Sequence, residues 1–406
     1  MYLHRQCEQT VETLSRMFGA VLVTGPRQVG KTTMLRAIRD GINYASLDDP
    51  ILLTSASEQT VTFFKDHKPP LFIDEVQKAP QLFPQMKLLI DQNGEKGQFY
   101  LCGSQQFHMM KHVSESLSGR LGILTLLGLS LRERYSVDFF QPFLPSDEYL
   151  AARNKQLTEI PYDAVWALIH RGSMPELCLN ETYDWQMFYG AYVRTYIERD
   201  IRELSQVGDE IKFMRFMMVL ASRTGQLLNL ASAARDVGIS QATAEQWLSI
   251  LAASHIVYLL QPYYNNLTSR AVKTPKLYFL DTGLAAYLTR WNTAEVLKSG
   301  AMAGAFFESF VIAEVLKSYY NFGVLDPPLY FYRDKEQREI DLLIEQDGVL
   351  FPLEIKKHAD PTRDDIRNFD VLDQLNINRG AGGVICLYDK MVTLAGNDRV
   401  IPIQYL

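Results

Sequence analysis

The chain has 406 residues, of which 47% are hydrophobic and 22% are charged, a composition typical of a globular protein with two to four domains. Its net charge of -6 does not favour a protein coated for nucleic-acid binding, and no apolar run approaches the roughly 20 residues that cross a membrane. The cysteines form no CxxC pair and the N-terminus lacks an apolar signal segment. We therefore expect reduced thiols in a cytoplasmic protein without a membrane partner.

The segment VLVTGPRQVGKTT at 21–33 combines an apolar strand, the pattern GxxxxGKT and residues that favour a helix. Backbone N–H groups of such a loop surround a phosphate chain, Lys31 reaches the outer phosphates, and the Thr32 hydroxyl can hold Mg²⁺. Glycine is needed where the backbone approaches the ligand closely. The sequence thus predicts ATP and Mg²⁺ as cofactors. The candidate nucleotide-binding residues are Gly25, Pro26, Arg27, Gln28, Val29, Gly30, Lys31, Thr32 and Thr33.

A second apolar strand, PPLFIDEV at 69–76, ends in two carboxylates. Asp74 would bind the Mg²⁺ ion through water, and Glu75 would orient and polarise the attacking water. The alternative is that both carboxylates only cap the following turn. Because the two motifs have matching context within one α/β unit, the paired interpretation is favoured and predicts a nucleoside triphosphatase, most simply of ATP.

Strand-like and helix-like runs alternate over residues 1–135, which predicts a doubly wound, mostly parallel sheet. Ligands of such sheets lie beyond the C-terminal ends of the strands, where Gly25–Thr32, Asp74–Glu75 and Ser104 fall. The expected strands are 20–24, 43–48, 70–74, 97–103 and 122–127. The expected helices are 5–17, 32–40, 51–66, 81–92 and 106–112.

Residues 136–160 are rich in proline and charge, typical of a connection, and 161–205 favour helices. Over 209–260 a helix, a tight turn at Gly238 and a second helix capped by Ser240 precede a β-rich run. With a hairpin between HIVYLLQPYYN and KTPKLYFLD, this order predicts a winged helix-turn-helix.

The second helix of that unit contains neither Lys nor Arg, so Gln241 and Gln246 are the only candidate readers of base edges. Packing of this helix in a domain interface is an equally good interpretation. The basic residues Arg270, Lys273 and Lys276 follow where a wing is expected.

From about residue 300, a helix (305–320) precedes strands that carry Asp341, Glu354 and Lys356. Period-two alternation places Glu354 and Lys356 on one face of their strand. Two carboxylates on adjacent strands can hold Mg²⁺, and a lysine beside them can activate water, which is the chemistry of phosphodiester hydrolysis. Glu308 on the preceding helix is a third candidate metal ligand. The alternative is a hairpin with exposed charges.

Charge weakens the prediction of DNA binding here, since residues 300–406 carry 11 Lys and Arg against 17 Asp and Glu. A local basic patch is still conceivable from Arg333, Lys335, Arg338, Lys356 and Lys357.

These motifs together resemble a group of bacterial and archaeal proteins that join an AAA-type ATPase to a C-terminal domain of unknown function with a restriction-endonuclease-type, PD-(D/E)xK fold. The pieces that carry the resemblance span nearly the whole chain; they are GPRQVGKTT, SLDDP, PLFIDEVQKAP, LCGSQQF, SLSGR, TPKLYFLDTGLAAYL, FFESFV and EIDLLIEQDGVLFPLEIKK. In the last piece, Ile340 stands where the nuclease motif often has proline.

The resemblance implies that Ser104 senses the γ-phosphate and that Arg120 is an arginine finger. Such a finger acts across a subunit interface, so the resemblance also implies a homo-oligomer. Alternatively, Ser104 caps a helix and Arg120 pairs with a nearby acid.

The predicted α/β chain therefore has four parts: an AAA-type ATPase core (1–140), a helical connector or lid (141–205), a winged helix-turn-helix (206–298) and a nuclease-like domain (299–406). One functional hypothesis is an ATPase coupled to Mg²⁺-dependent DNA processing. The other is a regulatory nucleotide switch whose C-terminal domain binds DNA or a protein partner without cleavage. A P-loop kinase is disfavoured because Glu75 suits water activation.

Overall fold

In a computed structural model of the protein, residues 2–103, 116–196, 209–263, 273–374 and 377–406 are described. The N-terminal region is a five-stranded sheet of order β2-β3-β4-β1-β5 in which all paired strands are parallel, which confirms the predicted parallel α/β sheet. Its strands are β1 (Ala20–Thr24), β2 (Asn43–Ser46), β3 (Leu71–Asp74), β4 (Phe99–Cys102) and β5 (Leu121–Thr125).

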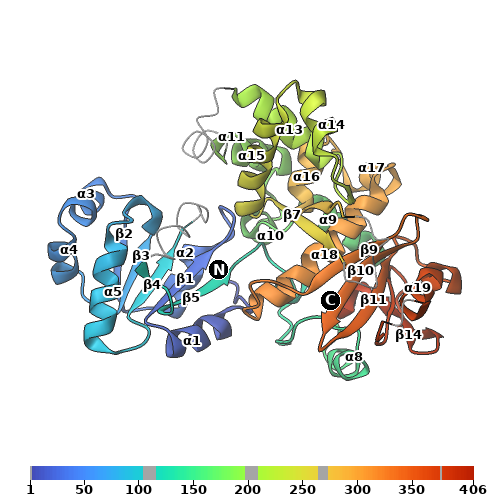
Figure 1. Cartoon of the computed structure of the whole chain (residues 1–406), viewed down its shortest axis with the longest axis horizontal. Coiled ribbons are helices and arrows are strands. Elements are labelled where there is room, and N and C mark those ends of the chain that lie inside the picture. The colour runs from blue at the N-terminus through green and yellow to red at the C-terminus, as the bar shows by residue number, and fades with distance from the viewer. Residues whose placement is uncertain (1, 104–115, 197–208, 264–272, 375–376) are drawn as a thin grey trace.

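Helices cover both faces of this sheet (Figure 1). Alternate residues of β1 enter two cores: Val21 and Val23 pack in one, and Ala20 and Leu22 in the other. The helices are α1 (Glu8–Met17), α2 (Lys31–Ile38), α3 (Pro50–Glu58), α4 (Thr60–Asp66) and α5 (Leu82–Asn93). The single helix expected over 51–66 is thus two helices, divided at Gln59, and the one expected over 106–112 lies outside the described residues.

The middle of the chain is mainly helical and includes a helix in the segment 136–160, where we expected a connection. This helix, α8, begins after Ser146, whose side chain accepts a hydrogen bond from the backbone N–H of Tyr149. The helices are α7 (Leu131–Arg134), α8 (Asp147–Asn154), α9 (Tyr162–Arg171), α10 (Pro175–Leu179), α11 (Trp185–Tyr196), α13 (Glu210–Ala221), α14 (Leu230–Val237), α15 (Gln241–Ala253), α16 (Thr282–Leu288) and α17 (Ala294–Ser299).

Helices α14 and α15 are joined at Gly238, which has a φ of 75°, and Ser240 caps α15 by accepting from the N–H of Thr243 at 3.1 Å. Strands β7 (Val257–Pro262) and β8 (Lys276–Phe279) follow as an antiparallel pair, and β8 also pairs with β6 (Gln226–Leu227). The described elements have the order expected for a winged helix, and that assignment remains a prediction.

The C-terminal strands belong to the same sheet as this hairpin. The nine strands have the order β13-β14-β12-β11-β10-β9-β7-β8-β6, and β7 joins β9 in parallel through the pairs Gln261 with Tyr330 and Pro262 with Phe331. The sheet therefore crosses the division that we placed between 298 and 299. Its remaining strands are β9 (Leu329–Arg333), β10 (Glu339–Gln346), β11 (Val349–Ile355), β12 (Gly383–Cys386), β13 (Val392–Ala395) and β14 (Asp398–Pro402), and α19 spans Asp370–Gln374.

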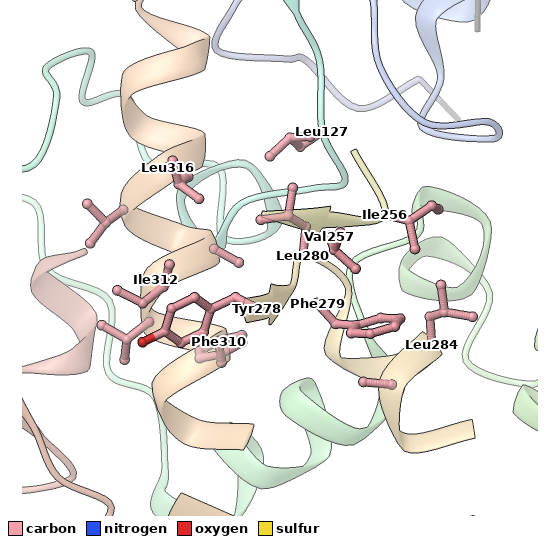
Figure 2. Close-up of a cluster of buried hydrophobic side chains, with 14 of the residues drawn as sticks. Leu127, Ile256, Val257, Tyr278, Phe279, Leu280, Leu284, Phe310, Ile312 and Leu316 are labelled. Atoms are coloured by element: carbon pink, nitrogen blue, oxygen red, sulfur yellow. The ribbon is translucent and has the colours of Figure 1, made fainter. Parts of the chain in front are cut away.

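Helix α18 (Ala303–Asn321) lies between the N-terminal and C-terminal sheets (Figure 1). Figure 2 shows Ile312 and Leu316 of this helix in one cluster with Leu127, from the segment after β5, and Tyr278 of β8. One hydrophobic core thus extends across all the regions of the chain. No helix of the described residues is long and apolar enough to cross a membrane.

Candidate nucleotide site and C-terminal carboxylate cluster

The loop between β1 and α2 has backbone geometry that requires glycine. Gly25 has a φ of 140°, and a Cβ atom there would lie 1.9 Å from the carbonyl oxygen of Leu126. Gly30 (φ 90°) and Gln28 (φ 60°) are also left-handed. The loop is thereby held close against the segment after β5. The loop ends at the first N–H groups of α2.

Lys31 lies over this loop and is largely buried. Its Nζ donates hydrogen bonds to the carbonyl oxygens of Gly25 at 2.9 Å and Pro26 at 2.7 Å. Burial lowers the pKa of Lys31, and the nearby carboxylates of Glu75 and Asp74 act in the opposite direction. Among the described residues this ammonium group is held by neutral carbonyls, which it can exchange for phosphate oxygens.

Asp74, at the end of β3, contacts the loop as the two motifs predict. Its Oδ1 accepts from the Thr32 hydroxyl at 3.2 Å and from the Cys102 thiol at 2.6 Å, and its Oδ2 accepts from the Tyr44 hydroxyl at 3.2 Å. A hydroxyl and a carboxylate are oxygen ligands that suit Mg²⁺. Sequence reasoning missed Tyr44 and Cys102; both lie on strands β2 and β4 that flank β3, which was the available signal.

Glu75 adopts a left-handed conformation with a φ of 55°, which is uncommon for a residue with a side chain. Its N–H donates to Asp74 Oδ1 at 3.0 Å, and its carboxylate accepts from the Gln77 amide. The Glu75 side chain makes no capping bond to the 3-10 helix that follows. The carboxylate is therefore not used as a simple turn cap.

Ser104 lies outside the described residues. Arg120 makes a two-pronged ion pair with Asp91, with Nε–Oδ1 2.6 Å and a second nitrogen 2.9 Å from Oδ2, so the nearby acid that we considered is present. The Arg120 carbonyl accepts from the N–H of Ala20, the first residue of β1. Arg120 therefore lies at the N-terminal ends of the strands, whereas Lys31 and Thr32 follow the C-terminal end of β1, so within its own chain Arg120 is remote from the loop.

A cavity of about 480 Å³ adjoins the loop. One wall consists of loop residues, and the other belongs to the helical region. The lining includes Gln28, Val29, Gly30 and Thr33, the N-terminal residues Tyr2 and Leu3, and Glu176, Leu179 and Phe188 near α10 and α11. Its size and partly apolar lining suit the nucleoside part of a nucleotide.

Arg5, which also lines this cavity, supports the loop and was not identified from the sequence. Its guanidinium donates to the carbonyls of Val29 and Leu127, both at 2.8 Å, and to Glu133 Oε1 at 2.9 Å. Both partners of the ion pair are buried. Burial by itself would raise the pKa of Glu133, but the positive charge of Arg5 outweighs burial and holds that pKa below its usual value. This pair ties the loop to helix α7.

The helical region also touches the back of the loop. Pro26 and Val29 line a small space together with Ser173, His255 and Asp281. Asp281 accepts from the backbone and hydroxyl of Ser173, at 2.7 and 2.8 Å. Burial lowers the pKa of His255 to about 4, so its imidazole is neutral near pH 7.

The residues predicted for a C-terminal site lie together. Lys356 Nζ is 2.6 Å from Glu354 Oε2 and 3.1 Å from Asp341 Oδ2, and Asp341 also accepts from the N–H of Ile355 at 2.9 Å. Burial raises the pKa of Glu354 well above its usual value. For Asp341, the ammonium groups of Lys276 and Lys356 outweigh burial and lower the pKa.

Lys276 completes this carboxylate cluster, which we define as Glu308, Glu339, Asp341 and Glu354. Its Nζ lies 2.9 Å from Glu308, 2.6 Å from Glu339 and 3.8 Å from Asp341, and the Tyr278 hydroxyl also donates to Glu308 at 2.5 Å. Lys276 lies on a hairpin strand as expected, but its side chain is only 3% exposed and cannot contact nucleic acid there. Sequence reasoning did not single out Glu339.

Mg²⁺ does not fit this cluster as it stands, because Lys276 and Lys356 already contact its carboxylates. Within the described ranges, no group of three or more His, Cys, Asp or Glu side chains is arranged to hold a metal ion. Glu354 Oε1 is buried and makes no hydrogen bond within the described residues, so it is an oxygen that a cation could contact.

The other predicted contacts with DNA are only partly accessible. Arg333 pairs with Glu339 and Arg338 with Asp334, at 3.0 and 2.7 Å, whereas Lys335 and Lys357 are exposed. Gln241 and Gln246 lie on the exposed face of α15, and Arg270 falls outside the described residues.

Comparison with known families supports the N-terminal assignment. Residues 18–135 match a family described as an AAA domain, so this part of the chain is an AAA-type ATPase domain. Residues 162–295 and 303–406 match two families that are each described as a domain of unknown function (DUF8612 and DUF4143). These two families carry no stated activity.

Two curated relatives cover most of the chain. The uncharacterized proteins Rv2008c of Mycobacterium tuberculosis and Mb2031c of Mycobacterium bovis are each 28% identical over 354 residues, which is 84% of this chain and 71% of theirs.

Among solved structures, a Walker-type ATPase of Pyrococcus abyssi shares 14% identity over 70% of this chain and 94% of its own, with a TM-score of 0.44. The RuvB Holliday junction branch migration motor of Thermotoga maritima shares 15% over 63% of this chain and 89% of its own, with a TM-score of 0.31.

Proposed function

We propose that this AAA-type ATPase binds and hydrolyses ATP with Mg²⁺ and acts as a switch between its ATPase core and its helical and C-terminal regions. The observation that carries the proposal is the meeting of Lys31, Thr32 and Asp74 beside a cavity with walls from two regions of the chain. A nucleotide that fills this cavity contacts both walls, so its binding and loss would change how the regions fit together.

Each residue has a distinct part in the proposed hydrolysis. Lys31 would hold the outer phosphates, and Thr32 and Asp74 would hold the Mg²⁺ ion. Mg²⁺, when bound, neutralises charge on the phosphates. Glu75 would orient a water molecule and accept its proton as that water attacks the terminal phosphorus.

Two further roles require a second copy of the chain or residues not described. Arg120, at the N-terminal ends of the strands, could reach a nucleotide only in a neighbouring subunit, so we propose a homo-oligomer in which it acts as a finger. Its exchange of Asp91 for phosphate would be part of that step. Ser104 remains the proposed sensor of the γ-phosphate.

The contacts that join the loop to α7 and α18 offer a route by which nucleotide binding could change the rest of the chain. Arg5 joins the loop to Glu133, and Leu131 of the same helix donates its N–H to Glu314 of α18 at 2.8 Å. Lys317 of α18 donates to the carbonyl of Leu129 at 2.9 Å. A shift of the loop would thus be transmitted to α18, which packs against the C-terminal sheet.

The cavity can be tested with neighbouring residues of α11. Phe188 lines it, whereas Met187 is 78% exposed. Phe188→Ala should weaken ATP binding measured by calorimetry by about 10-fold, the scale of losing an aromatic surface under a base, and Met187→Ala should not. Equal affinities of both variants and the wild type would place the nucleotide elsewhere.

A second candidate function is Mg²⁺-dependent cleavage of nucleic acid in the C-terminal region, with the PD-(D/E)xK fold that the resemblance implies. It is favoured by the contacts of Lys356 with Asp341 and Glu354. The test is incubation of plasmid and single-stranded DNA with Mg²⁺ or Mn²⁺, with and without ATP, comparing the wild type with Lys356→Ala. Cutting by the wild type alone supports a nuclease. No cutting, alongside ATP hydrolysis, supports a switch that binds DNA or a protein without cleaving it.

A further inference from the structure

The ammonium group of Lys276 lies where the carboxylates of the cluster converge. It reaches Glu308 on α18 and Glu339 and Asp341 on β10, at 2.9, 2.6 and 3.8 Å. A lysine ammonium is a compact positive charge with several donors, so it can satisfy several carboxylate oxygens at once. A cation shared by these oxygens would need the same space.

Burial makes this arrangement hard to disturb. Lys276 is 3% exposed, and the side chains of Glu308 and Glu339 are 15% and 23% exposed. Buried charges are stable only when they are paired, so removal of the lysine would leave carboxylates that take up either another cation or a proton. Lys356 cannot replace it, because its ammonium is engaged on the other side by Asp341 and Glu354.

The lysine comes from a different part of the chain than the carboxylates. Lys276 begins β8, where it pairs with Leu260 of β7 and Leu227 of β6, while β7 in turn pairs with β9. We propose that Lys276 is a built-in cation that fills the carboxylate cluster, so that the cluster has no place for a divalent metal ion while the lysine is present. In a variant without Lys276, Asp341 and Glu354, whose Oε1 has no partner within the described residues, would be the metal ligands.

This inference rests on the second candidate function and deepens it, because it names the group that keeps a metal ion out of that site. Its test reads metal binding directly, so that a lack of DNA cleavage does not decide it. Binding of Mn²⁺ to the full-length, nucleotide-free chain can be followed by electron paramagnetic resonance. All proteins carry Asp74→Asn, which removes the carboxylate of the nucleotide site.

In this background, Lys276→Met should gain a Mn²⁺ site. Its affinity for Mn²⁺ should exceed any Asp341-dependent binding of the parent by about 10-fold to 100-fold, which is the effect that groups neighbouring a metal site have on metal affinity. Adding Asp341→Asn should abolish the site. Lys298→Met, which removes a lysine paired with Asp163 on the surface, should leave Mn²⁺ binding unchanged.

The single substitution leaves buried carboxylates unpaired, which works against folding. The double variant Lys276→Met, Glu308→Gln avoids this, because it removes one positive and one negative charge together. It should fold, as judged by circular dichroism, and gain the same Mn²⁺ site. Two results contradict the proposal: a folded variant of either kind that gains no site, or a parent that already binds Mn²⁺ stoichiometrically at a site that Asp341→Asn abolishes. The second result is decisive whichever variants fold.

Discussion

The described part of the chain contains two sites built from lysine and carboxylate side chains, and they differ in what the lysines contact. In the N-terminal site, Lys31 donates to two backbone carbonyls and Asp74 accepts from hydroxyl and thiol groups. In the C-terminal cluster, Lys276 and Lys356 donate directly to carboxylates. The first arrangement keeps its charges available to a ligand, and the second compensates them internally.

This difference teaches that residue types alone do not define a site for phosphate or metal. A cation held by neutral acceptors gains strength when it meets a phosphate, because a charge-assisted bond replaces a weaker one. A buried cation that already has a carboxylate partner must lose that pairing first. The predictions that follow probe each side of this contrast.

The largest effect is expected for Lys31→Ala, which removes the cation that faces the phosphates. ATP turnover, measured as released phosphate, should fall by roughly 10²-fold to 10³-fold or below detection. Lys298→Ala, which alters a surface pair with Asp163, serves as the control and should hydrolyse ATP normally. A normal rate for Lys31→Ala would remove the loop from the reaction.

Glu75→Gln should bind ATP as the wild type does but hydrolyse it about 100-fold more slowly, because the amide cannot accept a proton from water. Binding by calorimetry and turnover by phosphate release separate the two effects. Glu95→Gln, at an exposed position outside the site, is the matched control. Fast hydrolysis by Glu75→Gln would mean that another group handles the water.

Arg5 and Glu133 form a compensated pair beside the nucleotide site, and the pH dependence of stability reports on it. The pKa of Glu133 is lower in the folded chain than in the unfolded one. Its contribution to the free energy of unfolding is therefore present above the unfolded pKa and lost as pH falls through the folded value. Urea unfolding from pH 7 to pH 3 should show a steeper acid loss for the wild type than for Glu133→Gln. Parallel curves would mean that the pair contributes nothing to acid sensitivity.

The smallest effect is expected for Glu354→Ala, which should leave ATP turnover within about twofold of the wild type because the cluster lies apart from the loop. Any nuclease activity should disappear in the same variant. A large loss of ATP turnover would show that the two sites communicate through α18 more tightly than their separate contacts suggest.

Local patterns in the sequence were sufficient for the N-terminal sheet and for the contact of Thr32 with Asp74. Strand alternation likewise placed Lys356 beside Glu354. These features depend on residues whose neighbours along the chain determine where they point.

The missed residues depend on contacts between distant segments. Arg5 meets Glu133 across 128 positions, and Lys276 meets Glu308 across 32. Nothing in the residues around Lys276 distinguishes a buried partner of carboxylates from a basic residue on a wing. The helix in 136–160 was missed because proline and charge around it outweighed the cap at Ser146.

The pairing of β7 with β9 has a practical consequence for anyone who wishes to produce the C-terminal region alone. A fragment that begins near residue 300 would lack β7 and leave the backbone groups of β9 unpaired along an exposed edge. Open strand edges promote association between copies, so such a fragment should form aggregates rather than a well-behaved monomer. A fragment that begins before α13 retains the hairpin and covers this edge.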